Sequence, residues 1–387
     1  MIEKVKAQIE KLQVELIELS KYILENPELG YEETKACRAH IDILKKYGFI
    51  VGEEYMGIKT AFRAEVVSDK KGPTIAYLSE YDALPGIGHG CGHNILGATS
   101  TGAGIILSKF IEKIGGKVVV IGTPAEETSG AKVEMAKNGA FNDVDIVMVA
   151  HPADKHFKSG NSLAMQAIQF DFKGKPAHAA MCPEKGINAL DAAINTFNNI
   201  NSLREHFQID AKVHGIITDG GKAANIVPDF ATAQFYVRAA TKTYLEELVE
   251  KVKNCARGAS LAAGTQLEIS HYEASFENLV TNQHLLMKYC EKLKDMGVEK
   301  IFEARESYGS LDAGNVSHVC PTIHPYFSIS DKPLIAHTKE FAEATNKPLA
   351  YEGMKNAIGA LVLTAIDVIE DRSFLHAIHE EFIVVEK

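Results

Sequence analysis

The chain has 387 residues, of which 46% are hydrophobic and 24% are charged, as is typical of a globular protein. This length exceeds what a single compact core usually supports, so we expect two domains. The formal net charge of −10 argues against nucleic acid or an anionic membrane as a partner, and no stretch of about 18 apolar residues predicts a membrane span.

The N-terminal segment predicts an amphipathic surface helix. Apolar residues recur at steps of three and four from Ile2 to Ile23, and Asn26-Pro27 ends the pattern. The segment is charged and has no continuous apolar stretch, so we do not expect a signal peptide. Six cysteines without a CxxC pair favour reduced thiols, and together these features predict a cytoplasmic protein.

Buried strands alternate with helices in the next part of the chain. After a second helix at 33–47, apolar runs predict strands at 74–79, 117–122 and 145–150. Small and apolar residues between these strands predict helices at 95–113 and near 128–138. Continuous apolar strands separated by helices are typical of a mostly parallel sheet flanked by helices on both faces.

The pattern changes after residue 162 and predicts an inserted α+β domain. The expected elements are a strand at 163–174, a helix at 186–206, strands at 212–218 and 229–240, a helix at 242–263 and a strand at 266–275. This β-α-β-β-α-β order is the ferredoxin-like unit, and its alternating strands indicate an antiparallel sheet with one free face. We place this domain at 163–281, inside a first domain formed by 1–162 and 282–387.

Six side chains that can bind or support a metal follow the three strands of the first domain. In chain order they are Asp82, Cys91, His93, Glu126, Glu127 and His151. Because ligands gather beyond the carboxyl ends of strands in an open parallel sheet, we expect these side chains at one rim. Thiolate, imidazole and carboxylate together suit zinc and its neighbours rather than calcium or magnesium.

Each of these residues also has an ordinary structural explanation. Cys91 alone is compatible with a small buried hydrophobe, and His151 with a hydrogen-bonded core histidine. Glu126 and Glu127 are compatible with the solvated start of a helix. Their joint placement at the ends of three strands favours a metal site over these separate explanations.

Several motifs, in their order along the chain, resemble a known family. They include Pro-Glu-Leu-Gly (27–30), Tyr-Asp-Ala-Leu-Pro (81–85), His-Gly-Cys-Gly-His (89–93), Pro-Ala-Glu-Glu (124–127), Ala-His-Pro (150–152), Lys-Pro-Ala-His-Ala-Ala (175–180), Ala-Asn-Ile-Val-Pro-Asp (224–229), Asp-Ala-Gly-Asn-Val-Ser (312–317) and Ala-His-Thr (336–338). Over nearly the whole chain the set resembles the aminoacylase/carboxypeptidase superfamily of di-metal peptidases. Within it, the chain is most similar to the amidohydrolases that include p-aminobenzoyl-glutamate hydrolase and the indole-acetyl-amino-acid hydrolases.

The resemblance implies a site with two divalent metal ions per subunit, zinc before manganese or cobalt. Carried over motif by motif, the implied ligands are Cys91, His93, Glu127, His151 and His337. Glu126 matches the general base, and Asp82 matches a carboxylate that orients a ligand histidine. One position departs from this branch, which usually has Asp where this chain has Asn94.

The resemblance also implies roles for the inserted domain, as a lid and as the surface of a homodimer or homotetramer. His178 resembles the family's lid histidine, which reaches a neighbouring subunit's site, although a surface-loop histidine is the alternative. Asn225 and Arg238 match residues that hold the substrate's terminal carboxylate. Arginine binds carboxylates bidentately, but on sequence alone an ion pair on the strand surface explains Arg238 equally well.

We therefore predict a metal-dependent amidohydrolase or peptidase acting on N-acyl amino acids, aminoacyl conjugates or short peptides. An endopeptidase or general amidase on the same metal core remains an alternative, as does a non-catalytic metal-binding scaffold. Glu126 argues against the scaffold, because a structural metal site needs no free base. The absence of a GxSxG element and of a P-loop leaves serine hydrolase and nucleotidase functions unsupported.

Overall fold

The computed structural model describes residues 1–305 and 309–385, and the chain divides into two compact units. The first unit contains 1–161, 279–305 and 312–385, and the second contains Ser162–Asn278 with residues 309–311. Each unit has its own hydrophobic core. The segment expected at 163–281 overlaps this second unit over residues 163–278.

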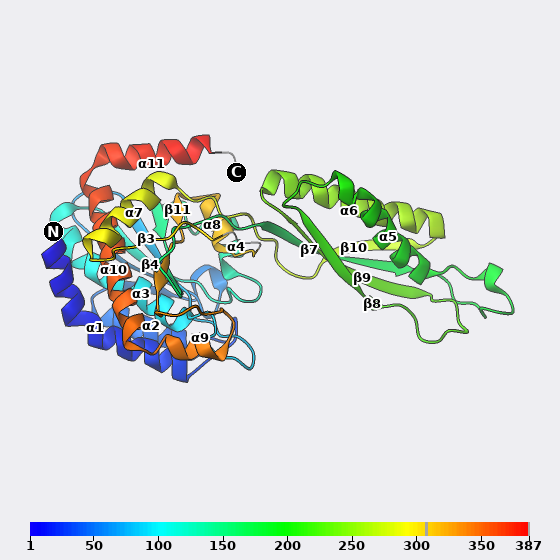
Figure 1. Cartoon of the computed structure of the whole chain (residues 1–387), viewed down its shortest axis with the longest axis horizontal. Coiled ribbons are helices and arrows are strands. Elements are labelled where there is room, and N and C mark those ends of the chain that lie inside the picture. The colour runs from blue at the N-terminus through cyan, green and yellow to red at the C-terminus, as the bar shows by residue number, and fades with distance from the viewer. Residues whose placement is uncertain (306–308, 386–387) are drawn as a thin grey trace. The chain divides into compact units, whose positions relative to one another are not determined.

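The first unit is built on a six-stranded sheet with the order β1-β2-β4-β3-β5-β11, of which β3, β4 and β11 are labelled in Figure 1. The strands are β1 (Ile50–Glu53), β2 (Phe62–Val67), β3 (Thr74–Ser79), β4 (Lys117–Gly122), β5 (Ile146–Met148) and β11 (Thr322–Ile323). β3 runs parallel to β4 and β5, and β11 runs parallel to β5, whereas β1 and β2 form an antiparallel edge. The predicted mostly parallel sheet is confirmed, with two edge strands that the sequence patterns did not indicate.

Helices cover both faces of this sheet. The helices of this unit are α1 (Ile2–Glu25), α2 (Thr34–Lys46), α3 (His93–Ile114), α4 (Ala131–Lys137), α7 (Gln283–Asp295), α8 (Ala313–Ser317), α9 (Lys339–Ala344), α10 (Pro348–Glu370) and α11 (Arg372–Val384). Ile75 and Tyr77 of β3 pack with α1, α3 and α10, while Ala76 and Leu78 face α4 and α8. Alternating residues of one strand thus serve two cores, which explains why the strand is apolar throughout.

Helix α3 enters the core at the point where the candidate metal ligands gather. It begins at His93, directly after Gly92, whose φ is +81°. A Cβ atom at Gly92 would lie 2.6 Å from Pro152. The left-handed backbone and the close approach both require glycine at this position. The turn that carries Cys91 and His93 is therefore fixed by local backbone geometry.

Two further strands make a small parallel sheet in the first unit, β6 (His151–Ala153) and β12 (Tyr326–Ser328). Short 3₁₀ turns occur at Tyr55–Gly57, Pro183–Lys185 and Arg204–His206. None of the helices in the described part of the chain is long and apolar enough to cross a membrane.

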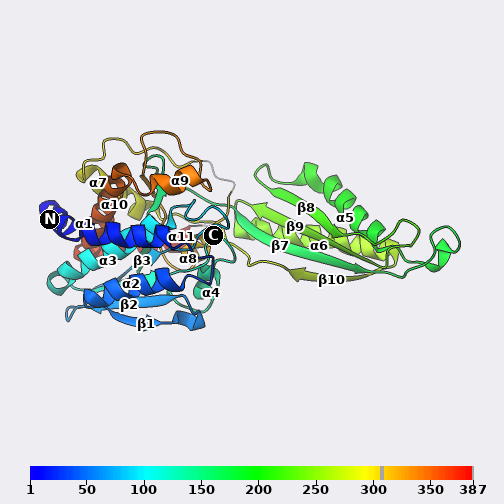
Figure 2. The same cartoon turned by 90° about the horizontal axis from the view of Figure 1, so that it is seen from below.

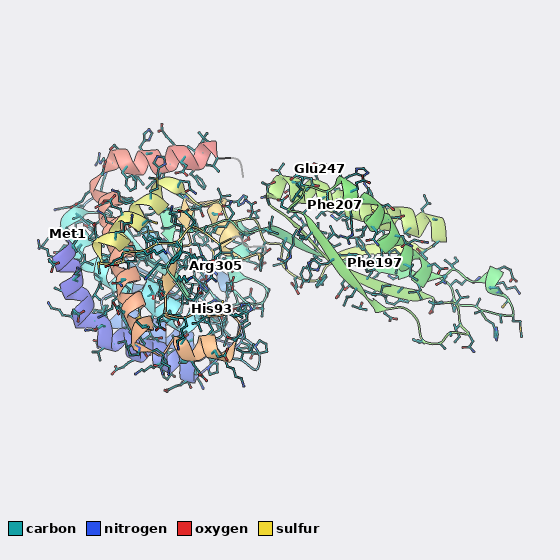
Figure 3. All side chains as sticks on the ribbon, in the orientation of Figure 1. Met1, His93, Phe197, Phe207, Glu247 and Arg305 are labelled. Carbon is teal, nitrogen blue, oxygen red and sulfur yellow. The ribbon has the colours of Figure 1, made fainter. Side chains whose placement is uncertain are left out.

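The second unit is a four-stranded antiparallel sheet with the order β10-β7-β9-β8 and two helices (Figure 2). Its elements are β7 (Ala164–Lys173), α5 (Ala189–Leu203), β8 (Lys212–Asp219), β9 (Phe230–Ala239), α6 (Lys242–Ala263) and β10 (Gln266–His271). Phe197 of α5, which is labelled in Figure 3, packs on Phe235 of β9 with ring centroids 4.6 Å apart. The helices cover one sheet face only, so the predicted ferredoxin-like arrangement is confirmed.

Candidate metal centre

The structure brings together the five residues that the resemblance implies as metal ligands, and Glu126 lies with them. Their ligand atoms form three groups, and within each group the atoms lie within 4.8 Å of one another. The groups are Cys91, His93 and His151; Cys91, Glu127 and His337; and His93, Glu126 and Glu127. Cys91 belongs to two of these groups, each with the three protein ligands that a zinc ion commonly takes.

Asp82 connects two members of this cluster. Its Oδ1 atom lies 2.9 Å from Nδ1 of His93, and its Oδ2 atom accepts a hydrogen bond from the Glu127 amide at 2.8 Å. Burial raises the pKa of Asp82. His93 and the Glu127 amide lower this pKa by more than burial raises it, so the pKa lies below its usual value. With Nδ1 of His93 donating to Asp82, the Nε2 atom is left as the ligand atom.

His151 is oriented by a backbone carbonyl, whereas His93 is oriented by a carboxylate. Its Nδ1 atom lies 2.8 Å from the carbonyl oxygen of Pro152, and its Nε2 atom lies 3.4 Å from the sulfur of Cys91. The sequence pattern placed His151 directly after a strand at 145–150. In the structure β5 is shorter, and His151 instead opens β6, which pairs with β12.

His337 forms the solvent-facing rim of the cluster. Its side chain is 54% exposed, and its Nε2 atom lies 3.4 Å from a carboxylate oxygen of Glu127. The backbone of His337 has a φ of +63°, an unusual conformation for a residue other than glycine. Its amide donates to the Gly90 carbonyl at 2.8 Å, which joins this loop to the Cys91 turn.

A second strained residue positions the two glutamates. Ala125 precedes them with a φ of +63°, and its amide donates to the Glu33 carboxylate at 2.8 Å. Glu33 is fully buried and also accepts a hydrogen bond from the Thr60 hydroxyl at 2.9 Å. Burial raises the pKa of Glu33 to about 7. Strain of this kind persists only where surrounding contacts hold it, and it concentrates at functional sites.

Glu126 differs from its neighbour in its surroundings. Its carboxylate lies 3.8 Å from Nε2 of His93, and its side chain is 16% exposed. Burial is the main cause that raises the pKa of Glu126 well above the usual value, followed by the nearby carboxylates of Glu80 and Asp312. The side chain therefore reaches both the cluster and the solvent.

A buried ion network that the sequence patterns did not reveal lies behind the cluster. The ammonium group of Lys132 is 2.9 Å from Glu80 and 2.7 Å from Asp312. The other oxygen of Glu80 is 3.3 Å from Nε2 of His93. All these side chains are buried. Glu80 stands two residues before Asp82 at the end of β3, which is the one sequence signal that pointed to it.

The charge balance of this region fits divalent cations. Its carboxyl side chains are Glu80, Asp82, Glu126, Glu127 and Asp312. Among the residues that the structure describes, Lys132 is the only lysine or arginine that is buried. In addition, Nε2 of His93 and Oε1 of Glu127 are buried without a hydrogen-bond partner. Buried charge needs compensation, and this donor set suits zinc or its neighbours.

Asn94 turns away from the cluster. Its amide group donates to the Ser20 hydroxyl at 3.0 Å and to the Thr345 hydroxyl at 3.1 Å. It therefore ties the start of α3 to α1 and to the end of α9.

The three remaining predicted site residues belong to the second unit. His178 is exposed in a loop, where its Nδ1 atom accepts a hydrogen bond from the Met181 amide at 3.1 Å. Asn225 is also exposed, and its carbonyl accepts from the Ala179 amide at 3.0 Å, which brings the two loops together. Arg238 lies on β9 and donates to the Ser310 hydroxyl at 2.8 Å. No described contact joins Arg238 to the other two.

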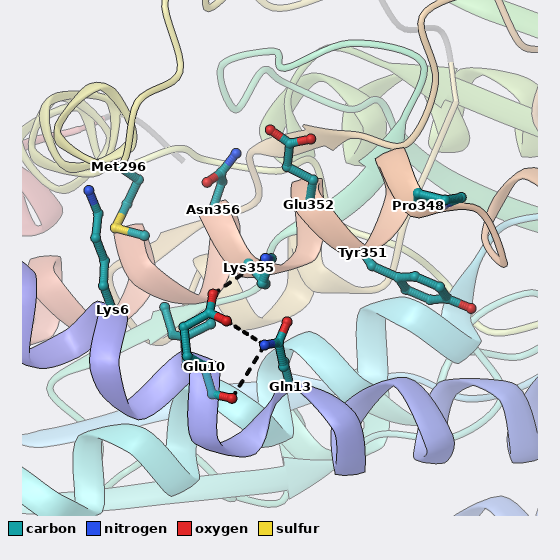
Figure 4. Close-up of a pocket in the computed structure, with 10 residues that line it drawn as sticks. Lys6, Glu10, Gln13, Met296, Pro348, Tyr351, Glu352, Lys355 and Asn356 are labelled. Atoms are coloured by element: carbon teal, nitrogen blue, oxygen red, sulfur yellow. Dashed lines mark hydrogen bonds and ion pairs between the residues drawn. The ribbon is translucent and has the colours of Figure 1, made fainter.

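A groove elsewhere in the first unit lies between α1 and α10 (Figure 4). Its cavity has a volume of about 610 Å³, and none of the predicted site residues lines it. Glu10 in this groove bonds to Gln13 and Lys355, so its charge is already satisfied within the protein. The groove has no cluster of metal-binding or nucleophilic side chains among its described lining residues.

Comparison with known proteins agrees with the architecture and with the motifs. Residues 163–262 match the peptidase dimerisation domain of the M20 family. The chain is 36% identical over 382 residues to the Xaa-Arg dipeptidase of Mus musculus, covering 94% of this chain and 88% of that protein. It is 34% identical over 272 residues to a p-aminobenzoyl-glutamate hydrolase protein of Escherichia coli, covering 65% of this chain and 56% of that protein.

Solved structures share the fold. A dinuclear metal-binding peptidase of the M20 family from Bacillus subtilis superposes with a TM-score of 0.69 at 22% identity, covering 92% of this chain and 99% of that chain. An aminobenzoyl-glutamate utilization protein from Klebsiella pneumoniae gives a TM-score of 0.73 at 19% identity, and the match covers 93% of this chain and 97% of that chain. The resemblance expected from the motifs is confirmed, and the chain belongs to the M20 family of di-metal peptidases and amidohydrolases.

Proposed function

We propose that the chain is a metal-dependent dipeptidase that hydrolyses the amide bond next to a free carboxylate. The observation that carries this proposal is the shared position of Cys91 in two ligand groups, with Glu126 beside them. The relatives support the substrate class, since Xaa-Arg dipeptides and p-aminobenzoyl-glutamate both join an acyl group to an amino acid. The dipeptidase likeness extends over more of the chain, so we favour dipeptides.

Two divalent ions would be held by the two groups that share Cys91. His93 and His151 would complete one site, and Glu127 and His337 the other. Such ions lower the pKa of a bound water and polarise a carbonyl oxygen. We expect zinc, with manganese or cobalt as alternatives, because the thiolate, imidazole and carboxylate donors accept all three.

The protein's own residues would move the proton. Glu127 is a ligand candidate in this arrangement, whereas Glu126 has its carboxylate beside the cluster and partly open to solvent. Glu126 would take a proton from the attacking water and return it to the leaving amine. Asp82 would keep His93 in the tautomer that presents Nε2 to the ion.

The second unit would hold the substrate. We assign Arg238 and Asn225 to the terminal carboxylate and His178 to the reacting carbonyl of a neighbouring subunit's site. The exposure of His178 and Asn225 and the hydrogen bond between their loops are compatible with binding at a subunit interface. The match of 163–262 to a dimerisation domain supports a homodimer, which could pair further into a tetramer.

The test compares dipeptides that carry a free C-terminal carboxylate with the corresponding amides and methyl esters. After removal of metal with a chelator and reconstitution with Zn²⁺, Mn²⁺ or Co²⁺, we expect the acids to be cleaved preferentially. A charge-assisted hydrogen bond contributes about 1.5–3 kcal/mol, so kcat/KM should differ by roughly one to two orders of magnitude. Arg238→Ala should remove this preference by slowing cleavage of the acids alone.

Three outcomes would contradict the proposal. Equal cleavage of acids and esters by the wild type would favour a general amidase or an endopeptidase on the same metal core. Full activity in protein shown by elemental analysis to be free of metal would exclude the metal-dependent mechanism. Metal binding without any turnover of the panel would favour a non-catalytic scaffold.

A further inference from the structure

A pair of short strands places a tyrosine beside the candidate metal ligands. β12 pairs with β6 in parallel, and Tyr326 stands opposite His151 in the register. Residues that face each other on neighbouring strands point to the same side of a sheet. The two rings accordingly lie close together, with centroids 5.5 Å apart. The strand pairing therefore fixes Tyr326 next to a residue of the cluster.

His324 holds the tyrosine ring from another side. Its ring lies 5.2 Å from that of Tyr326 at an interplanar angle of 69°, and 5.4 Å from that of His151. His324 is buried, and its Nδ1 atom has no hydrogen-bond partner. Edge-to-face packing of this kind favours one plane for the phenol ring. Tyr326 is thus positioned by packing and not by a hydrogen bond of its own hydroxyl.

The Tyr326 hydroxyl has no partner within the described part of the chain, although buried tyrosine hydroxyls usually find one. The side chain is half-buried, so a small molecule can reach it. Burial raises the pKa of the phenol, and the nearby Cys91 and Glu126 raise it further. A hydrogen-bond donor without a protein acceptor therefore lies beside the cluster, next to the ring of His151.

We propose that the Tyr326 hydroxyl donates a hydrogen bond to the oxygen of the scissile carbonyl as negative charge develops on it. The inference rests on the proposed function, because it requires amide hydrolysis at this cluster. A donor that is aimed at developing charge stabilises the transition state more than the bound substrate. Tyr326 would supply this donor from the same unit as the metal ligands, in addition to any donor from a neighbouring subunit.

The direct test is Tyr326→Phe, which removes the hydroxyl and keeps the ring packing. We expect kcat to fall roughly 10²-fold, as when one donor to an oxyanion is removed, while KM changes little. Metal content and the thermal midpoint should stay at wild-type values. Tyr289→Phe is the control, because the Tyr289 hydroxyl likewise has no partner but is buried on α7, outside the cluster.

A binding measurement separates catalysis from structure. A phosphinic analogue of the dipeptide imitates the tetrahedral transition state, and calorimetry should show its affinity weakened by Tyr326→Phe but not by Tyr289→Phe. Affinity for the product amino acid should not change in either variant. Wild-type kcat and phosphinate affinity in Tyr326→Phe would overturn the inference and leave the proposed function standing. If the wild type neither cleaved dipeptides nor bound the phosphinate, both proposals would be wrong.

Discussion

At the scale of single residues, one buried carboxylate organises much of the candidate centre. Asp82 uses one oxygen for the imidazole of His93 and the other for the backbone of Glu127. These two residues come from different parts of the chain, since His93 is the first residue of α3 and Glu127 lies in the loop after β4. Asp82 therefore fixes the positions of His93 and Glu127 relative to each other. Hydrogen bonds to metal ligands of this kind commonly affect metal affinity and ligand orientation.

The neighbouring glutamates provide a prediction in which each is the control for the other. Glu126→Gln should retain the metal content of the wild type but lose most turnover, because a general base contributes roughly 10²–10⁴-fold. Glu127→Gln should instead lose metal, since its carboxylate belongs to two ligand groups. Elemental analysis together with kcat distinguishes the two effects. A Glu126→Gln protein with wild-type kcat would place the base elsewhere.

The sequence predicted those site residues that follow a strand or belong to a motif. It did not predict the network of Lys132, Glu80 and Asp312, because the pairing of Lys132 with Asp312 joins positions 180 residues apart. It also gave no sign of Tyr326, whose place depends on the register of two three-residue strands. Contacts of this kind arise from packing and leave no periodic pattern in the chain.

At the scale of elements, the long helices and buried strands were predictable because their apolar residues recur with a clear period. β1, on the other hand, is exposed at most positions and offers no apolar pattern. The boundaries of β5 and β6 also escaped prediction, because the apolar run at 145–150 continues through the turn between them. Because residues 146–150 are all buried, their apolar pattern does not indicate where β5 ends and β6 begins.

The loop that carries Glu126 is anchored by Glu33, which gives a prediction on pH. Folding raises the pKa of Glu33 from 4.5 to about 7, mainly through burial. The folded state therefore binds the Glu33 proton more tightly than the unfolded state. This contribution to stability is fully present below pH 4.5 and is lost as the pH rises toward 7. The loss is roughly 3 kcal/mol for a shift of this size.

Glu33→Gln isolates this contribution, because glutamine can still accept the bond from the Ala125 amide but does not ionise. The free energy of unfolding of the wild type, minus that of Glu33→Gln, should decrease between pH 4.5 and 7 and level off above. Denaturant titrations of the metal-loaded proteins measure this difference. Glu32→Gln controls for the removal of a charge, since Glu32 is exposed. A difference independent of pH would show that Glu33 does not titrate on folding.

At the scale of the whole molecule, the candidate metal cluster and the match to a dimerisation domain lie in different units. The first unit contains every member of the candidate metal cluster, and the second contains the match to a dimerisation domain. The second unit has helices on one face of its sheet, and its edge strand β8 is largely exposed. An unpaired edge is available for a second chain. We propose that the resulting homodimer presents His178 of one subunit to the site of the other.

Mixing two inactive variants tests this arrangement. Glu126→Gln lacks the base and His178→Ala lacks the lid histidine, so each homodimer should be nearly inactive. If His178 acts across the interface, a mixed dimer contains one site with an intact Glu126 and an intact His178 from the other chain. When the variants are co-expressed in equal amounts, half of the dimers are mixed and each has one complete site, so about one quarter of wild-type kcat should return. If His178 serves its own subunit, every site lacks one of the two residues and mixing restores no activity.

Light scattering on the same samples measures the oligomeric state, and a monomer at micromolar concentration would exclude the interface altogether.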